Sequence, residues 1–216
     1  PIITKWNGRV LYIDGFAGAG VHISRQTKAF TLGSPLNALL VNPPFKEYHL
    51  VDLDTGKANM LRDRTKDNPS VSVYEGDCNE ILLNRVFPRA RYEDYARGLC
   101  VLDPYGLHLN WEVVKTAGGM KSIEIFLNFP IMDMNMNVLW HDSSSVSQNQ
   151  SERMNKFWGD STWKDVAYTI EQDLFGEVEK KAENIAIVNA YKNRLITLAG
   201  FKYVQEPIPM RNSKGA

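Results

Sequence analysis

Near the start of the chain the sequence reads Val10-Leu11-Tyr12-Ile13-Asp14-Gly15-Phe16-Ala17-Gly18-Ala19-Gly20. An apolar run rich in β-branched and aromatic residues, followed by an acid and a turn of small residues, is typical of a buried parallel strand. Gly18 and Gly20 have no Cβ, so the backbone there can turn sharply and approach a bound molecule closely. Ligands of open α/β sheets bind at such strand ends. This stretch therefore predicts an α/β fold with a ligand site after its first strand.

The glycine turn differs from the fingerprint that binds dinucleotides. That fingerprint needs a third small residue three places after the second glycine, where this chain has Ile23, so an NAD(P)-dependent oxidoreductase is disfavoured. Class I S-adenosylmethionine (SAM)-dependent methyltransferases have a first motif similar to the one formed here by Asp14, Phe16, Gly18 and Gly20. The alternative is a glycine-rich turn in an unrelated α/β domain, because short motifs recur by chance.

Composition describes one ordinary globular domain over residues 1–216, large enough for a substantial core. Lys plus Arg equals Asp plus Glu, so no global positive field attracts nucleic acid. We find no signal peptide and no apolar run of membrane-spanning length, and we expect a cytoplasmic protein without a membrane partner. Cys78 and Cys100 follow neither a metal-ligand nor a disulfide spacing, so we interpret them as buried thiols and predict no metal.

The second predicted strand also ends in an acid. It covers residues 48–52, and in nucleoside-binding α/β folds an acid at this strand end accepts hydrogen bonds from the ribose hydroxyls. Asp52 holds that place, and Asp54 is a near alternative that equally suits the cap of the next helix. The distance from Gly20 exceeds the usual spacing of about 20 residues. We attribute the excess to an insertion at 21–33.

Residues 71–75 form the third predicted strand, and Asp77 follows it. Methyltransferases of this class commonly place a group that reads the adenine amino group just past this strand. Asp77, with Glu80 three residues later, also fits a capping box that begins a helix reaching Phe87. The two roles are compatible.

The fourth predicted strand, residues 98–103, leads into Asp103-Pro104-Tyr105-Gly106. This turn looks like the catalytic Asp-Pro-Pro-Tyr motif of methyltransferases that act on an adenine or guanine nitrogen. The resemblance implies that Asp103 and the Pro104 carbonyl accept hydrogen bonds from the amino group and that Tyr105 stacks on the base. One proline is missing, so Tyr105 comes one residue early. The alternative is a plain turn before a helix over 110–117. Cys100 lies within the strand, which disfavours covalent cytosine-C5 chemistry.

The remaining chain is less distinctive. We expect helices over 35–41 and 55–66, a fifth strand over 122–130 after a helix that ends at Gly118-Gly119, a mobile segment over 132–151, a long helix over 177–198 and a strand beginning at 201–204. Phe157, Trp158 and Trp163 are expected to anchor the core. Residues 85–92 form a basic cluster with interleaved aromatics, either a nucleic-acid platform or a solvated connection. In a methyltransferase sheet the chain would next form an antiparallel seventh strand. We find no such strand in the sequence, which predicts that the end of the chain is clipped or disordered.

Together these motifs resemble those of the three-Cys-motif partner proteins of bacteria. The matching pieces are Tyr12-Ile13-Asp14-x-Phe16-Ala17-Gly18, Gly33-Ser34-Pro35, Tyr74-Glu75-Gly76-Asp77-x-Asn79, Asp103-Pro104-Tyr105-Gly106-Leu107 and Phe129-Pro130. The resemblance implies a Rossmann-like methyltransferase fold, with a mostly parallel central sheet and helices on both faces. It also implies association with a radical-SAM-type protein that carries three cysteines. This chain has no three-cysteine cluster and would be the partner.

Two hypotheses follow for function. In the first, the chain is a SAM-dependent methyltransferase that acts on or binds nucleic acid. Its cofactor would contact Asp14, Phe16, Gly18, Gly20, Asp52 and Asp77, and its methyl acceptor would contact Asp103, Pro104 and Tyr105. In the second, the same fold serves as a non-catalytic binding or scaffold subunit. A fold alone does not choose between them.

Overall fold

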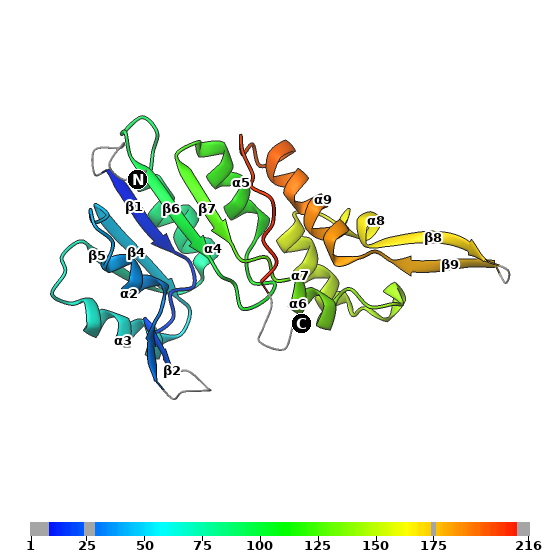
Figure 1. Cartoon of the computed structure of the whole chain (residues 1–216), viewed down its shortest axis with the longest axis horizontal. Helices are drawn as coiled ribbons and strands as arrows, with labels where there is room; N and C mark the ends of the chain where they lie inside the picture. Colours follow the sequence, from blue (N-terminus) through cyan, green and yellow to red (C-terminus); the bar gives the residue numbers. More distant parts are fainter. Residues whose placement is uncertain (1–8, 24–28, 174–175, 211–216) are drawn as a thin grey trace.

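A computed structural model describes residues 9–23, 29–173 and 176–210. Its centre is a five-stranded, all-parallel sheet in the order β5-β4-β1-β6-β7 (Figure 1). The strands are β1 (Val10–Asp14), β4 (Glu47–Asp52), β5 (Val71–Glu75), β6 (Arg97–Leu102) and β7 (Ile123–Leu127). The chain runs outward from β1 through β4 to β5 and then crosses to β6, so the strand order reverses beside β1. The predicted Rossmann-like α/β fold is confirmed.

Helices cover both faces of this sheet, as predicted. One face is covered by α2 (Ser34–Leu39) and α3 (Thr55–Thr65), whose apolar residues pack on β1 and β4. The other face is covered by α4 (Cys78–Ile81), which continues through a π-helical turn (Leu82–Val86) and a 3₁₀ turn (Phe87–Arg89), and by α5 (Trp111–Met120). No helix in the described part of the chain has both the length and the apolar character needed to cross a bilayer.

Both cysteines are buried in the larger core with free thiols, which confirms that interpretation. Burial raises the pKa of the Cys78 thiol to about 12 and that of the Cys100 thiol well above its usual range.

A helical layer extends this core beyond β7. It consists of α6 (Ile131–Asn137), a 3₁₀ turn (Ser143–Ser145), α7 (Gln148–Trp158), α8 (Trp163–Ala167) and α9 (Asn184–Thr197). Phe157, Trp158 and Trp163 are buried in it, so the predicted core anchors are confirmed. Much of the segment 132–151, which we expected to be mobile, lies in α6 and in the first turn of α7.

Two antiparallel hairpins lie outside the central sheet. Within the predicted insertion, β2 (Val21–Ile23) pairs with β3 (Phe30–Leu32). The second hairpin pairs β8 (Tyr168–Asp173) with β9 (Gly176–Lys181) and forms an arm that projects from the helical layer (Figure 1).

The helix expected over 177–198 is wrong in its first third, because residues 177–181 belong to β9. Gly176, the first residue of β9, has a φ of +130°, which an α-helix does not allow. The strand expected at 201–204 is also wrong. Those residues are in no strand, and the Phe201 amide instead bonds the Leu195 carbonyl of α9. Within the described residues no strand follows β9. The stretch 210–215 is typical of a hairpin turn in sequence, and all of it but Met210 lies outside the described part.

The end of α5 differs from the sequence-based expectation as well. The helix runs through Gly118 and Gly119 to Met120, and Lys121 ends it with a φ of +58°. Gly118 is needed for another reason: a Cβ there would lie 2.2 Å from the Ala199 carbonyl oxygen. At Gly119, by contrast, a Cβ would have no neighbour within 4 Å. The first glycine permits α5 to pack closely against the chain that follows α9.

Candidate functional site

The turn after β1 is held by the two strands that flank it. The Gly15 amide donates to the Val101 carbonyl on β6 over 3.0 Å, and the Ala17 amide donates to the Val51 carbonyl on β4 over 2.9 Å. The Gly18 amide then donates to Oδ2 of Asp52 over 2.8 Å. The turn therefore lies across the carboxyl ends of three parallel strands, beside the point where the strand order reverses.

Asp52, the residue predicted to accept the ribose hydroxyls, fixes this turn. Its second oxygen, Oδ1, accepts from the Asp54 amide over 2.9 Å. A carboxylate oxygen has two lone pairs, so each oxygen of Asp52 keeps one acceptor site for a further donor. Asp54 caps α3 by accepting from the Lys57 amide. The capping role that the sequence left open for Asp54 is confirmed.

The two glycines of the turn have different surroundings. Both have positive φ angles, +64° at Gly18 and +78° at Gly20, in the region that favours glycine. A Cβ at Gly20 would lie 2.9 Å from Leu61 and 3.1 Å from Leu36, so this glycine is needed for packing. A Cβ at Gly18 would meet nothing within 4 Å. The backbone at Gly18 is thus open to the close approach of a bound molecule.

Asp14, at the end of β1, is fully buried. Its Oδ2 accepts from the Ser34 hydroxyl over 2.6 Å and from the Tyr12 hydroxyl over 3.1 Å, and its Oδ1 accepts from the Phe16 amide over 3.2 Å. Burial raises the pKa of the Asp14 carboxyl, and the negative charge of Asp103 raises it further, while these hydrogen bonds act in the opposite direction. In this structure Asp14 ties the glycine turn to the start of α2.

The raised pKa of Asp14 predicts a pH dependence of stability. Above its ordinary value of 3.8, the unfolded chain loses a proton that the folded chain keeps until its own, higher pKa is passed. The stability that this group contributes is therefore fully present below pH 3.8. It falls by about 1.4 kcal/mol per pH unit as pH rises from there to the folded-state pKa. Asp14→Asn, which cannot ionise, should gain stability relative to the wild type as pH rises from 4 to 8. Urea unfolding at several pH values measures this difference, and a constant difference would contradict the assignment.

Asp77 lies after β5 and is exposed. It caps α4, but Oδ1 accepts from the amide of Asn79 over 2.9 Å, and the predicted capping box with Glu80 is wrong. The Asn79 side chain donates to the same oxygen, from Nδ2 to Oδ1 of Asp77 over 2.8 Å. The adenine-reading role of Asp77 stays a prediction.

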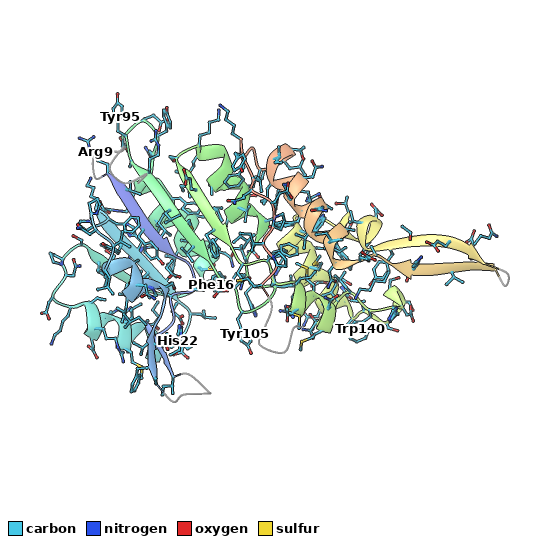
Figure 2. The ribbon with its side chains drawn as sticks, viewed as in Figure 1. Arg9, Phe16, His22, Tyr95, Tyr105 and Trp140 are labelled. Atoms are coloured by element: carbon cyan, nitrogen blue, oxygen red, sulfur yellow. The ribbon has the colours of Figure 1, made fainter. Side chains whose placement is uncertain are left out.

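The loop after β6, residues 103–110, presents two exposed side chains at its start. Asp103 is exposed, and its Oδ1 accepts from Nδ2 of Asn128, at the end of β7, over 2.6 Å. Pro104 is buried, whereas the Tyr105 side chain is 97% exposed. Figure 2 shows Tyr105 and Phe16 toward the carboxyl ends of the strands, and Arg9 and Tyr95 at the opposite end of the sheet.

The residues predicted for the site thus all end or follow β1, β4, β5 or β6, at the carboxyl edge of the parallel sheet. Asp14 and Asp103 are near enough for the charge of one to act on the other. Sequence reasoning did not assign a role to Asn79 or Asp133, whose side chains hold the 103–110 loop. Predicting a helix over 131–137 would have pointed to Asp133, but the methionines that alternate with polar residues there do not form a helical pattern.

The basic cluster at 85–92 is largely paired with neighbouring side chains. The Arg85 guanidinium lies 4.8 Å from the centre of the Tyr74 ring, and Arg89 forms a 2.8 Å ion pair with Glu47. A pocket of about 360 Å³, partly lined by Arg91 and Tyr92, lies where β6 and β7 begin and therefore at the sheet end remote from the glycine turn. These contacts favour the solvated connection over a nucleic-acid platform.

Comparison with protein-family models finds no matching family, and comparison with curated proteins finds no similar sequence.

Proposed function

We propose that the carboxyl edge of the sheet binds SAM and that the chain is a methyltransferase whose acceptor is a nucleic acid or a modified base. The observation that carries the proposal is the Gly18 turn, with its left-handed backbone, its open side and its bond to Asp52 beside the strand-order reversal. The acids and the aromatic ring that follow the neighbouring strands support the same site. The motif resemblances described above supply the choice of SAM among nucleoside ligands.

Each side chain has a distinct role in this proposal. The open backbone at Gly18 would admit the methionyl end of the cofactor, and the free lone pairs of Asp52 would accept the ribose hydroxyls. When bound, SAM supplies a methyl group on a sulfonium that is already a good leaving group. Asp103 would accept a hydrogen bond from the acceptor, and the exposed ring of Tyr105 would stack on its base. Rate enhancement would come mainly from positioning.

The association with a radical-SAM-type protein that carries three cysteines is part of the same proposal, and it rests on the motif resemblance alone. A second candidate function is a non-catalytic subunit that binds nucleic acid or scaffolds this partner. The observation that favours it is the shortened Asp103-Pro104-Tyr105 turn, which lacks one proline of the amino-methyltransferase motif. The chain has no net charge, so a nucleic acid would have to be bound locally.

Cofactor binding is tested by calorimetry with SAM and with its demethylated product. Asp52→Ala should weaken binding by about 1–3 kcal/mol, the value of a hydrogen bond to a charged group together with the released turn. Asp54→Ala is the matched control, because it removes a neighbouring acid that caps α3 and should leave the affinity unchanged. Binding by neither ligand, or equal losses in the two variants, would reject the proposed site.

Measuring methyl transfer distinguishes the methyltransferase from the non-catalytic subunit. Transfer of tritiated methyl groups to DNA, RNA or a cell lysate is expected for the wild type. Asp103→Ala should abolish transfer and leave cofactor affinity unchanged, because Asp103 is assigned to the acceptor. Cofactor binding without transfer to any of these acceptors would support the non-catalytic subunit, and unchanged transfer by Asp103→Ala would remove its assigned role.

A further inference from the structure

We infer that Asn79 and Asp133 are positioning residues, whose side chains clamp the 103–110 loop so that Asp103 and Tyr105 meet the acceptor in a fixed arrangement. The inference rests on the proposed function, and it adds two residues to which that function assigns no contact. Both act through the loop and neither is expected to touch the acceptor.

Asn79, in α4, holds the far end of the loop. Its Nδ2 donates to the His108 carbonyl over 2.9 Å, and its Oδ1 accepts from the Asn110 amide over 2.7 Å. The side chain is 7% exposed, so water competes little for these bonds. The amide therefore directs both kinds of polar atom at one short piece of backbone. These two bonds do not cap α4, because its N-cap is Asp77.

Asp133, near the start of α6, holds the middle of the loop. Its Oδ2 accepts from the Leu107 amide over 3.0 Å and forms a 3.3 Å ion pair with Arg153 of α7, and its Oδ1 accepts from Asn137 over 2.8 Å. The loop approaches this carboxylate closely, since a Cβ on Gly106 would lie 2.8 Å from Oδ2. The helical layer thereby fixes the residues directly after Tyr105.

The clamp leaves Tyr105 as an exposed ring on a restrained backbone. Asn128 holds Asp103, Asp133 holds Leu107, and Asn79 holds the segment from 108 to 110. Ordering a free loop at the moment of binding would cost conformational entropy for every residue fixed. A loop ordered in advance avoids that cost, which is how a remote side chain raises the rate of a reaction. The Tyr105 ring is almost fully exposed, so the stability of the fold does not require this ring to be held in place.

The decisive variant is Asp133→Ala, with Asn135→Ala as matched control on the same helix. The Asn135 side chain forms hydrogen bonds with Asn184 and Lys181, and among the described residues it forms none with the loop. In Asp133→Ala we expect hydrogen exchange of the Leu107 amide to rise about 10-fold or more, because its acceptor is lost. Affinity for the demethylated cofactor should change less than about 2-fold, and methyl transfer at saturating cofactor should fall about 10- to 100-fold. The control should match the wild type in all three measurements.

Asn79→Asp provides a second variant, which keeps an oxygen for the Asn110 amide and removes the Nδ2 donor that bonds both the His108 carbonyl and Oδ1 of Asp77. Increased exchange at 107–110 and slower transfer are again expected. Unchanged exchange in both variants would overturn the clamp, and unchanged transfer despite faster exchange would overturn the positioning role. Failure of the wild type to bind cofactor or to transfer methyl groups would instead overturn the proposed function, and the exchange measurement would still decide whether the loop is clamped.

Discussion

Gly118→Ala is expected to lower the free energy of unfolding by about 1–3 kcal/mol or more, the usual cost of inserting an atom into a packed region. The new Cβ would lie 2.2 Å from the Ala199 carbonyl oxygen, and a backbone atom cannot move aside as the end of a side chain can. The α5 helix and the segment after α9 would have to separate. Urea unfolding monitored by tryptophan fluorescence measures the change.

Gly119→Ala is the matched control, and its expected effect has the opposite sign. Gly119 is exposed, and a Cβ there meets nothing within 4 Å. Replacing a helical glycine by alanine should therefore stabilise the protein by about 0.8–1 kcal/mol through helix propensity. Equal effects of the two substitutions would show that α5 and Ala199 are not in close contact at Gly118.

Tyr191→Ala is expected to lower the free energy of unfolding by about 3–5 kcal/mol, the cost of removing a large aromatic side chain from a core. The Tyr191 ring is 2% exposed and lies among four aromatic rings, with centroid distances of 5.0 Å to Phe129 and 5.1 Å to Phe157. The other two rings are those of Trp111 and Trp158. Thermal and urea unfolding both measure the loss.

Tyr191→Phe should instead leave stability unchanged or raise it by about 1 kcal/mol. The Tyr191 hydroxyl is buried and has no hydrogen-bond partner among the described residues, and burying such a group is unfavourable. Burial also raises the pKa of this phenol, so the group stays neutral over the ordinary pH range. A clear loss of stability in Tyr191→Phe would show that the hydroxyl has a partner in solution, such as a buried water.

The five strands of the sheet were predictable because each is a short apolar run followed by a polar turn. The bounds predicted from these runs agree to within about one residue with those of β1, β4, β5 and β6. The helical layer was less predictable because its local patterns are ambiguous. Alternating Met and Asn residues at 132–137 do not form one apolar stripe, yet Asp133 and Met134 fix that segment as a helix through tertiary contacts. The β9 strand was mistaken for helix because its residues are mostly charged and none is buried, so no alternation of buried and exposed positions indicates a strand.

The candidate site was predictable in its location and not in its internal bonds. Parallel strands bring their carboxyl ends to one edge, so acids that follow different strands are expected there together. The sequence cannot state which partner each acid finds. Asp14 is buried against Ser34, and Asp52 accepts from Gly18, a residue 34 positions earlier. Long-range bonds of this kind depend on how helices and turns settle on the sheet.

The burial of both cysteines has a practical consequence for spectroscopy. Thiolates are the reactive form, and the raised pKa values of Cys78 and Cys100 leave these groups protonated and shielded from reagents. The chain contains no other cysteine. A single cysteine introduced at an exposed position such as Thr169, on the projecting arm, would then be the one site that maleimide dyes or spin labels modify in the folded protein.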